Sequence, residues 1–148
     1  MSTNETVNFA LTEEQKEIQL LARDFAKNEI APGAEHFEKT HEYPLPVIKK
    51  AQAMGLTSMN VAEKYGGLGL SLFEEVIVGE ELAWACSGIG LTITINNLAA
   101  LPVIVGGNEA QKQDFLGRLV DGKLAAYCVT EPDAGSDVAA IKTSAHRE

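Results

Sequence analysis

The sequence predicts a mainly α-helical protein that passes, near its end, into the beginning of a β domain. Five segments carry apolar residues at helical spacing, and three of them start with a pattern that caps a helix. The stretch "LAAYCVT" at 124–130 is instead short, apolar, partly β-branched or aromatic, and followed by turn formers. We therefore predict an N-terminal all-α domain over 1–122 and the incomplete beginning of a β domain over 123–148.

The first two helices have clear sequence boundaries. "TEEQ" is a capping box in which Thr12 caps the first free N–H groups and Gln15 reaches back. Ala31-Pro32-Gly33 is expected to end this first helix. A second, short helix is predicted to begin at Pro46, which suits a first helical turn, and to end at Gly55.

The third helix is predicted to begin with the capping box "SLFE" at 71–74 and to continue to about Cys86. Its adjacent carboxylates, Glu80 and Glu81, are expected to be solvated, although such pairs also occur in acid/base sites. The last helix is predicted to begin at Asn108, whose box partner is Gln111, and to end at about Val120.

The stretch "GIGLTITINNLAALPVIVGG" at 88–107 is ambiguous. Alternating apolar residues at 89, 91, 93 and 95 favour a strand. A helix fits nearly as well, with the apolar residues at 91, 95, 98 and 99 on one face. Pro102 is a candidate start for a fourth, short helix that Gly106-Gly107 would end.

Charge and composition exclude several classes of function. The net charge is −9, from 21 acidic and 12 basic residues, which argues against nucleic acid and anionic membranes as partners. No stretch approaches the about 18 uninterrupted apolar residues of a membrane span. Because we also find no signal or transit peptide, we expect a cytoplasmic protein. Neither the three histidines nor the two cysteines have the spacing of metal ligands, so no metal site is predicted.

Two glycine-containing loops are candidate ligand sites. In "AEKYGGLGLS" at 62–71, unusual backbone angles explain the glycines better than a phosphate cradle, since no dinucleotide or P-loop pattern is present. In "TEPDAGSD", the small residues Ala134 and Gly135 let a ligand approach the main chain, and Thr130 and Ser136 add hydroxyl groups. This loop is either a site for a pyrophosphate or a heterocycle edge, or an ordinary turn between strands.

The run "CVTEPDAGSDVAA" from Cys128 to Ala140 resembles the flavin-site signature of acyl-CoA dehydrogenases. In order, that signature requires a small residue, an aliphatic residue, Ser or Thr, and Glu. After two free positions it requires a small residue, Gly, Ser or Thr, and Asp, and after two more free positions another small residue. Every fixed position fits. "EKYGGLG" and "LTEEQKEIQLLARDFAKNEIAP" also resemble family segments, in the expected order. Short- and medium-chain members are the most similar.

The resemblance implies an N-terminal helical domain, a middle β domain and a C-terminal helical bundle. The chain is therefore expected to be an N-terminal fragment, and its segment 89–99 is expected to be helical. In the family, FAD accepts a hydride from the β-carbon of an acyl-CoA thioester during fatty-acid β-oxidation, while a glutamate removes the α-proton. That glutamate comes from the C-terminal bundle, so the resemblance assigns no catalytic residue here and implies an inactive chain.

The resemblance also implies partners and a location. These are an acyl-CoA thioester, electron-transferring flavoprotein as the electron acceptor of the full-length enzyme, and a full-length homotetramer. A processed eukaryotic form would lie in the mitochondrial matrix. The alternative is a non-catalytic helical fragment that binds acyl-CoA or a subunit.

Site residues follow from the resemblance position by position. Thr130 is expected to face the flavin ring edge, and Ser136 to contact both FAD and the CoA substrate. Asp133 stands where close relatives often have glycine, and its carboxylate would repel a pyrophosphate unless it points away. The full set expected beside FAD is Tyr127, Cys128, Val129, Thr130, Glu131, Pro132, Asp133, Ala134, Gly135 and Ser136. The acyl chain is expected to contact Leu91, Thr94 and Leu98.

Overall fold

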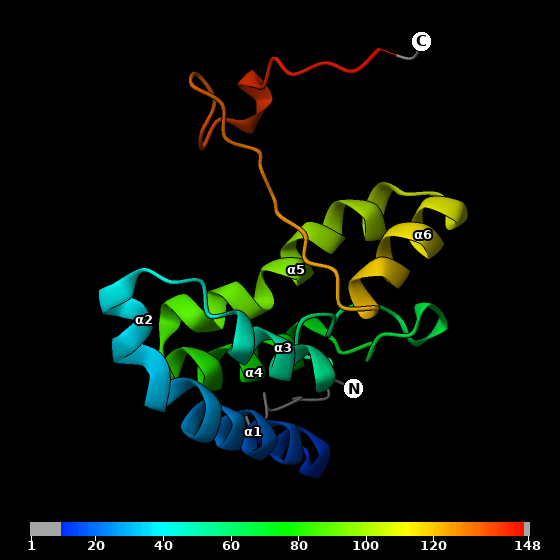
Figure 1. The fold of residues 1–148 in the computed structure, drawn as a ribbon. Coiled ribbons are helices and arrows are strands. Elements are labelled where there is room, and N and C mark those ends of the chain that lie inside the picture. Colours follow the sequence, from blue (N-terminus) through cyan, green and yellow to red (C-terminus); the bar gives the residue numbers. More distant parts are fainter. Residues whose placement is uncertain (1–9, 147–148) are drawn as a thin grey trace, which may run out of the picture.

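The computed structural model describes residues 10–146, and the regular structure in that part of the chain is helical (Figure 1). The α-helices are α1 (Glu13–Phe25), α2 (Ala34–Thr40), α3 (Leu45–Ala53), α4 (Leu72–Ala85), α5 (Ser87–Gly106) and α6 (Glu109–Val120). α4 packs between α1 and α5, and α6 lies beside the second half of α5 (Figure 1). The prediction of a mainly α protein is confirmed.

Two apolar clusters hold the helices together. The larger joins α1, α3, α4 and the first half of α5, and its fully buried side chains include Ile30, Leu82 and Ile93. The smaller joins α5, α6 and the loop before α4, around Val61 and Leu116. α5 contributes to both clusters and is therefore the central element of the domain.

The beginning of α1 is confirmed, but its predicted end is wrong. Thr12 caps the helix by accepting a hydrogen bond from the Gln15 backbone N–H at 3.2 Å, and the Gln15 side chain accepts one from the Thr12 N–H at 3.0 Å. The chain then stays helical through a π turn (Ala26–Ile30), a 3-10 turn (Ala31–Gly33) and α2. Pro32 permits this because it lies in the first turn of a new helical segment, where its missing N–H would have no partner.

The predicted capping box of α4 is confirmed, and a hydrogen bond links it to that of α1. Ser71 donates to the Glu74 carboxylate through both its backbone N–H, at 3.0 Å, and its hydroxyl. The Gln15 side-chain amide donates to the same carboxylate at 2.8 Å. The Ser71 hydroxyl and then Gln15 hold the pKa of Glu74 below its ordinary value. The N-termini of α1 and α4 are thereby joined.

α5 is one continuous helix, which decides the ambiguous stretch. Its most buried residues recur at helical spacing, at Ile89, Ile93, Asn96 and Ala100. Leu91, which a strand would place on the same side as Ile89, is 62% exposed. The separate short helix predicted from Pro102 is wrong, because Pro102 lies inside α5.

By length and composition alone, α5 could also cross a membrane. The core helix of a globular protein meets the same test, so this observation is weak support for a span. α5 packs against α4 and α6, and it buries the polar side chains of Asn96 and Asn97. A core helix accounts for these features.

The glycine-rich loop after α3 has the unusual backbone that the sequence predicts. Gly66 and Gly69 have φ of +91° and +63°, a region that residues with a Cβ adopt at a cost. At Gly67 an added Cβ would lie 2.0 Å from the carbonyl oxygen of Val61. The loop needs glycine for its backbone angles and its close packing.

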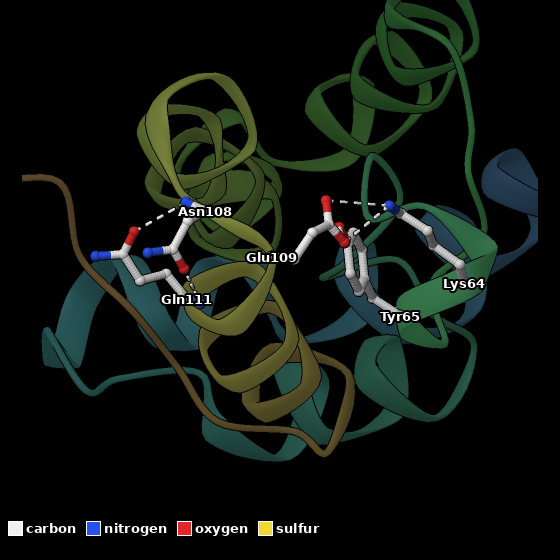
Figure 2. A network of polar contacts seen from close by, with 5 residues as sticks. All are labelled: Lys64, Tyr65, Asn108, Glu109 and Gln111. Atoms are coloured by element: carbon white, nitrogen blue, oxygen red, sulfur yellow. Dashed lines mark hydrogen bonds and ion pairs between the residues drawn. The ribbon is translucent and has the colours of Figure 1, made fainter.

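A polar network fixes this loop against the N-terminus of α6 (Figure 2). The Tyr65 hydroxyl donates to the Glu109 carboxylate at 3.0 Å, and the Lys64 ammonium lies 3.1 Å from the same oxygen. Glu109 directly follows the N-cap residue Asn108, and the predicted capping box of Asn108 and Gln111 is confirmed. The Lys64 ammonium and then the Tyr65 hydroxyl hold the pKa of Glu109 below its ordinary value.

The chain leaves the helical domain after α6 and projects away from it (Figure 1). Two buried or half-buried side chains hold the start of this segment. The Asn96 amide donates to the Lys123 carbonyl at 2.9 Å and accepts from the Ala125 N–H at 2.8 Å. The Gln52 amide donates to the Gly122 carbonyl at 2.9 Å.

The expected beginning of a β domain is not seen in the described residues. Segment 124–130 contains no assigned strand, and within 10–146 the only bridge pairs Glu131 with Ala134 across a turn. A strand is defined by hydrogen bonds to a neighbouring strand. No described segment supplies that neighbour, so the β-type composition of 124–130 does not produce a sheet.

Candidate functional site

A groove of about 270 Å³ lies between α4 and α5. α4 lines it with Leu72, Glu75, Val76 and Gly79, and α5 lines it with Thr94, Asn97, Leu98 and Leu101. Each set recurs at three- and four-residue spacing, so each is one face of its helix. The groove is therefore a direct product of packing two helices side by side.

Two of the three residues predicted to contact an acyl chain lie in this groove. Thr94 and Leu98 line it, whereas Leu91 does not, although it occupies the same face of α5 one turn earlier. The Thr94 hydroxyl lies within hydrogen-bond distance of two carbonyls of its own helix, those of Gly90 at 3.3 Å and Leu91 at 3.2 Å. Donating in this way leaves the lone pairs of the Thr94 oxygen available to a ligand.

The segment before α4 closes one side of the groove through Met59. The Met59 backbone N–H donates to the Asn97 side-chain oxygen at 3.1 Å, and the Asn60 side-chain amide donates to the Asn97 carbonyl at 3.0 Å. Asn97 is 4% exposed. These bonds position the middle of α5 against the loop and hold that wall of the groove in place.

Glu75 places a carboxyl group in this groove. It is half-buried, and burial raises its pKa. The other carboxylates of α4 differ: Glu74 is held by the capping network, Glu80 is exposed, and Glu81 is paired with Arg23. The prediction that Glu81 is solvated is wrong, since Glu81 is 4% exposed.

The predicted flavin-contacting segment begins as exposed, irregular chain. Tyr127, Cys128 and Thr130 are exposed, and Val129 is half-buried. Within the described residues, the backbone groups of 126–130 make no hydrogen bond to other backbone groups. These N–H and C=O groups are free to bond a ligand, and the FAD contact expected at 127–130 stays a prediction.

The following turn is closed by its own residues. Backbone bonds link Glu131 and Ala134 in both directions, at 2.9 and 3.2 Å. The Glu131 carboxylate accepts from the backbone N–H of Lys142 at 2.8 Å and of Thr143 at 2.9 Å, and from the Thr143 hydroxyl. The Lys142 N–H and then the Thr143 hydroxyl lower the pKa of Glu131. Glu131 therefore organises the turn.

The remaining predicted residues of the turn differ in exposure. Asp133 is paired with the Lys142 ammonium at 3.1 Å, which offsets the charge that would repel a pyrophosphate. Ala134 is 2% exposed, whereas Pro132, Gly135 and Ser136 are exposed. A Cβ at Gly135 would meet no atom within 4 Å. The exposed side of the turn at 135–136 is thus open to a ligand.

α5 carries the groove and the anchor of the C-terminal segment on opposite faces. At about 100° per residue, Asn96 lies about 200° from both Thr94 and Leu98. Asn96 holds residues 123–125, while Thr94 and Leu98 line the groove. The structure therefore brings the two predicted parts of the site to one helix but not to one cavity.

Sequence reasoning missed Glu75, Gly79 and Asn97 as groove residues. The signal that could have found them is the helical spacing of 72, 75, 76 and 79, and of 94, 97, 98 and 101. Using it required knowing that 88–106 is a helix and that α4 packs beside it.

The described residues form a helical domain with a groove between two adjacent helices, followed by a short turn after the last helix. The profile of the acyl-CoA dehydrogenase N-terminal domain matches residues 12–123. The chain therefore belongs to the acyl-CoA dehydrogenase family.

Individual family members agree with this assignment. The probable medium-chain specific acyl-CoA dehydrogenase 2, mitochondrial, of Caenorhabditis briggsae is 40% identical over 149 residues, covering 100% of this chain and 36% of that protein. Butyryl-CoA dehydrogenase of Megasphaera elsdenii is 35% identical with a TM-score of 0.81, over 89% of this chain and 36% of that one. Acyl-CoA dehydrogenase of Bacillus anthracis complexed with FAD is 35% identical with a TM-score of 0.79, over 93% and 24%. This chain spans about a third of the length of the first two relatives and about a quarter of the third.

Proposed function

We propose that this chain supplies the acyl-binding groove and the first flavin-contacting segment of a FAD-dependent acyl-CoA dehydrogenase of fatty-acid β-oxidation. The observation that carries the proposal is the groove itself. In a chain of this family, it lies between α4 and α5 and is lined by Thr94 and Leu98. Those are two of the residues that the resemblance assigns to acyl contacts.

The proposed reaction removes a proton from the α-carbon and a hydride from the β-carbon of an acyl-CoA thioester. FAD, when bound, supplies the hydride acceptor. The residues of this chain orient the acyl chain in the groove through apolar contacts with Val76, Leu98 and Leu101. The free peptide groups of 126–130 and the open turn at 135–136 are the proposed FAD contacts.

Partners and location belong to the same proposal. Electron-transferring flavoprotein is the proposed electron acceptor, and the full-length enzyme is proposed to be a cytoplasmic homotetramer. The net charge of −9 disfavours nucleic acid and anionic membranes as alternative partners.

The second candidate function is a non-catalytic acyl-CoA-binding module. It is favoured by the fact that α4, α5 and Met59, all within this chain, line the groove. On this reading the chain binds an acyl group without turnover.

Titration of the purified chain with octanoyl-CoA tests acyl binding. We expect Leu98→Glu to weaken binding, because a second carboxylate in the groove must be desolvated. Val105→Glu is the matched control, since Val105 lies two turns after Leu98 on the same helix face, is 83% exposed and does not line the groove, so this variant is expected to leave binding unchanged. Equal effects of the two variants would contradict the groove assignment.

The two candidate functions are separated by a turnover assay. We expect the 148-residue chain to give no steady-state reduction of an artificial acceptor with octanoyl- or butyryl-CoA, with or without added FAD. Binding of both FAD and octanoyl-CoA would support the enzyme reading for the longer protein. Binding of octanoyl-CoA without FAD would support the binding module.

A further inference from the structure

Folding of the described residues does not explain the carboxyl group of Glu75. It is half-buried in a largely apolar groove, and within residues 10–146 it has no ion pair or side-chain hydrogen bond. Glu74 one residue earlier and Glu81 further along α4 both have such partners. A half-buried carboxyl group without a protein partner leaves its oxygens free to accept hydrogen bonds from a group bound in the groove.

Gly79, one helical turn after Glu75, leaves space beside this carboxyl group. Its φ is not positive, and an added Cβ would meet no atom within 4 Å. Neither backbone geometry nor packing requires glycine at this position, and glycine disfavours a helix interior. Gly79 therefore keeps the α4 wall of the groove open next to Glu75.

The polar atoms that line this groove include two acceptors, at Glu75 and Thr94, and one donor, the buried side-chain nitrogen of Asn97, which has no partner in the described residues. Glu75 offers carboxyl oxygens, and the Thr94 hydroxyl on the opposite wall can donate within its own helix and still accept from a ligand. A plain methylene chain would displace water from the Glu75 carboxyl group. It could not replace the hydrogen bonds that this water makes to the carboxyl oxygens. A hydroxyl group on the chain would donate to it.

Resting on the proposed acyl-binding function, we propose that the groove selects acyl groups that carry a hydroxyl on the chain, and that Glu75 is the specificity-determining acceptor. The remaining lining, including Val76, Leu98 and Leu101, holds the methylenes on either side of the hydroxyl. Gly79 gives the hydroxyl-bearing carbon room to approach Glu75.

Calorimetric titration of this chain with octanoyl-CoA and with its chain-hydroxylated isomers tests the proposal. At least one isomer is expected to bind about tenfold more tightly than octanoyl-CoA, because a site built to bond a hydroxyl discriminates against the analogue that lacks it. Glu75→Leu is expected to remove this preference and to tighten octanoyl-CoA binding. Glu80→Leu, at an exposed position of the same helix, is the control and is expected to keep the preference.

A third variant locates the binding. Gly79→Leu fills the groove and is expected to weaken octanoyl-CoA and the preferred isomer alike, while circular dichroism shows an unchanged fold. One outcome would overturn the role of Glu75 but leave acyl binding in the groove standing. In that outcome Gly79→Leu weakens octanoyl-CoA binding, but no hydroxylated isomer is preferred. Absence of binding by every acyl-CoA would overturn the proposed function as well.

Discussion

The guanidinium of Arg23 on α1 holds the buried carboxylate of Glu81 on α4. It also lies over the ring of Trp84, 4.7 Å from the centroid. The hydrogen bond to Glu81 is the largest cause that raises the pKa of Arg23. One side chain therefore neutralises a buried charge and covers an exposed aromatic ring at the contact between α1 and α4.

We expect Arg23→Met to lower the melting temperature, because the buried Glu81 carboxylate would lose its donor. Lys16→Met is the control, since Lys16 pairs with Glu13 on the surface of α1 and such pairs contribute little. Thermal unfolding by circular dichroism measures both. Equal melting temperatures for the two variants would show that Glu81 does not depend on Arg23.

Glu131 makes the turn at 131–143 sensitive to acid. Its folded-state pKa lies below the ordinary value, so its hydrogen bonds stabilise the turn above that ordinary value and are lost as pH falls through the lowered pKa. We expect the amide resonances of Lys142 and Thr143 to shift together, with a midpoint pH below the titration midpoint of an ordinary glutamate. Titration by NMR, with Glu131→Gln as the control, should show no such transition in the variant.

Gly67 tests how closely the loop before α4 packs. We expect Gly67→Ala to cost about 1–3 kcal/mol, because the new Cβ would displace the Val61 carbonyl. Gly117→Ala in α6 is the matched control, since its Cβ would meet nothing within 4 Å. There we expect a gain of up to about 1 kcal/mol from helix propensity. Denaturant unfolding measures both, and a neutral Gly67→Ala would contradict the close contact.

At the scale of elements, α5 links the parts of the domain. One face contributes to the apolar clusters, another lines the groove, and Asn96 bonds residues 123 and 125. The same helix therefore positions both the groove and the departure of the chain towards the predicted flavin segment.

Replacing Asn96 should release that departure. We expect Asn96→Leu to destabilise the protein by about 1–3 kcal/mol, since it leaves the Ala125 N–H and the Lys123 carbonyl without their partner. Hydrogen exchange at the Ala125 amide should accelerate. Gln52→Met, which frees only the Gly122 carbonyl, is the control and should leave the Ala125 amide protected. Unchanged exchange in Asn96→Leu would refute the anchoring role.

At the scale of the whole molecule, we propose that the domain boundary lies at 122/123, where the helical packing ends. Beyond Ala125 the chain projects away from the helices (Figure 1). We expect limited proteolysis to cut first within 126–146 and to leave a fragment with unchanged helicity. Mass spectrometry and circular dichroism test this. Strong amide-exchange protection across 124–145 in a monomer would contradict it.

Interactions between residues close together in the sequence were easier to predict than interactions between distant residues. The capping boxes of α1, α4 and α6 join residues three positions apart, and all three were predicted correctly. The pair of Arg23 and Glu81 joins residues 58 apart, and the burial of Glu81 was predicted wrongly. The expected FAD contacts at 127–136 remain predictions that rest on the family resemblance.

The sequence by itself determined where most helices begin, why the loop at 66–69 needs glycine, and which family the chain belongs to. Only the tertiary structure decided that 87–106 is one helix, that Glu75 and Gly79 share a groove with Thr94, and that 124–130 forms no strand. The physical reason is that caps and backbone angles depend on near neighbours in the chain. Burial, grooves and strand pairing depend on which distant segment packs alongside.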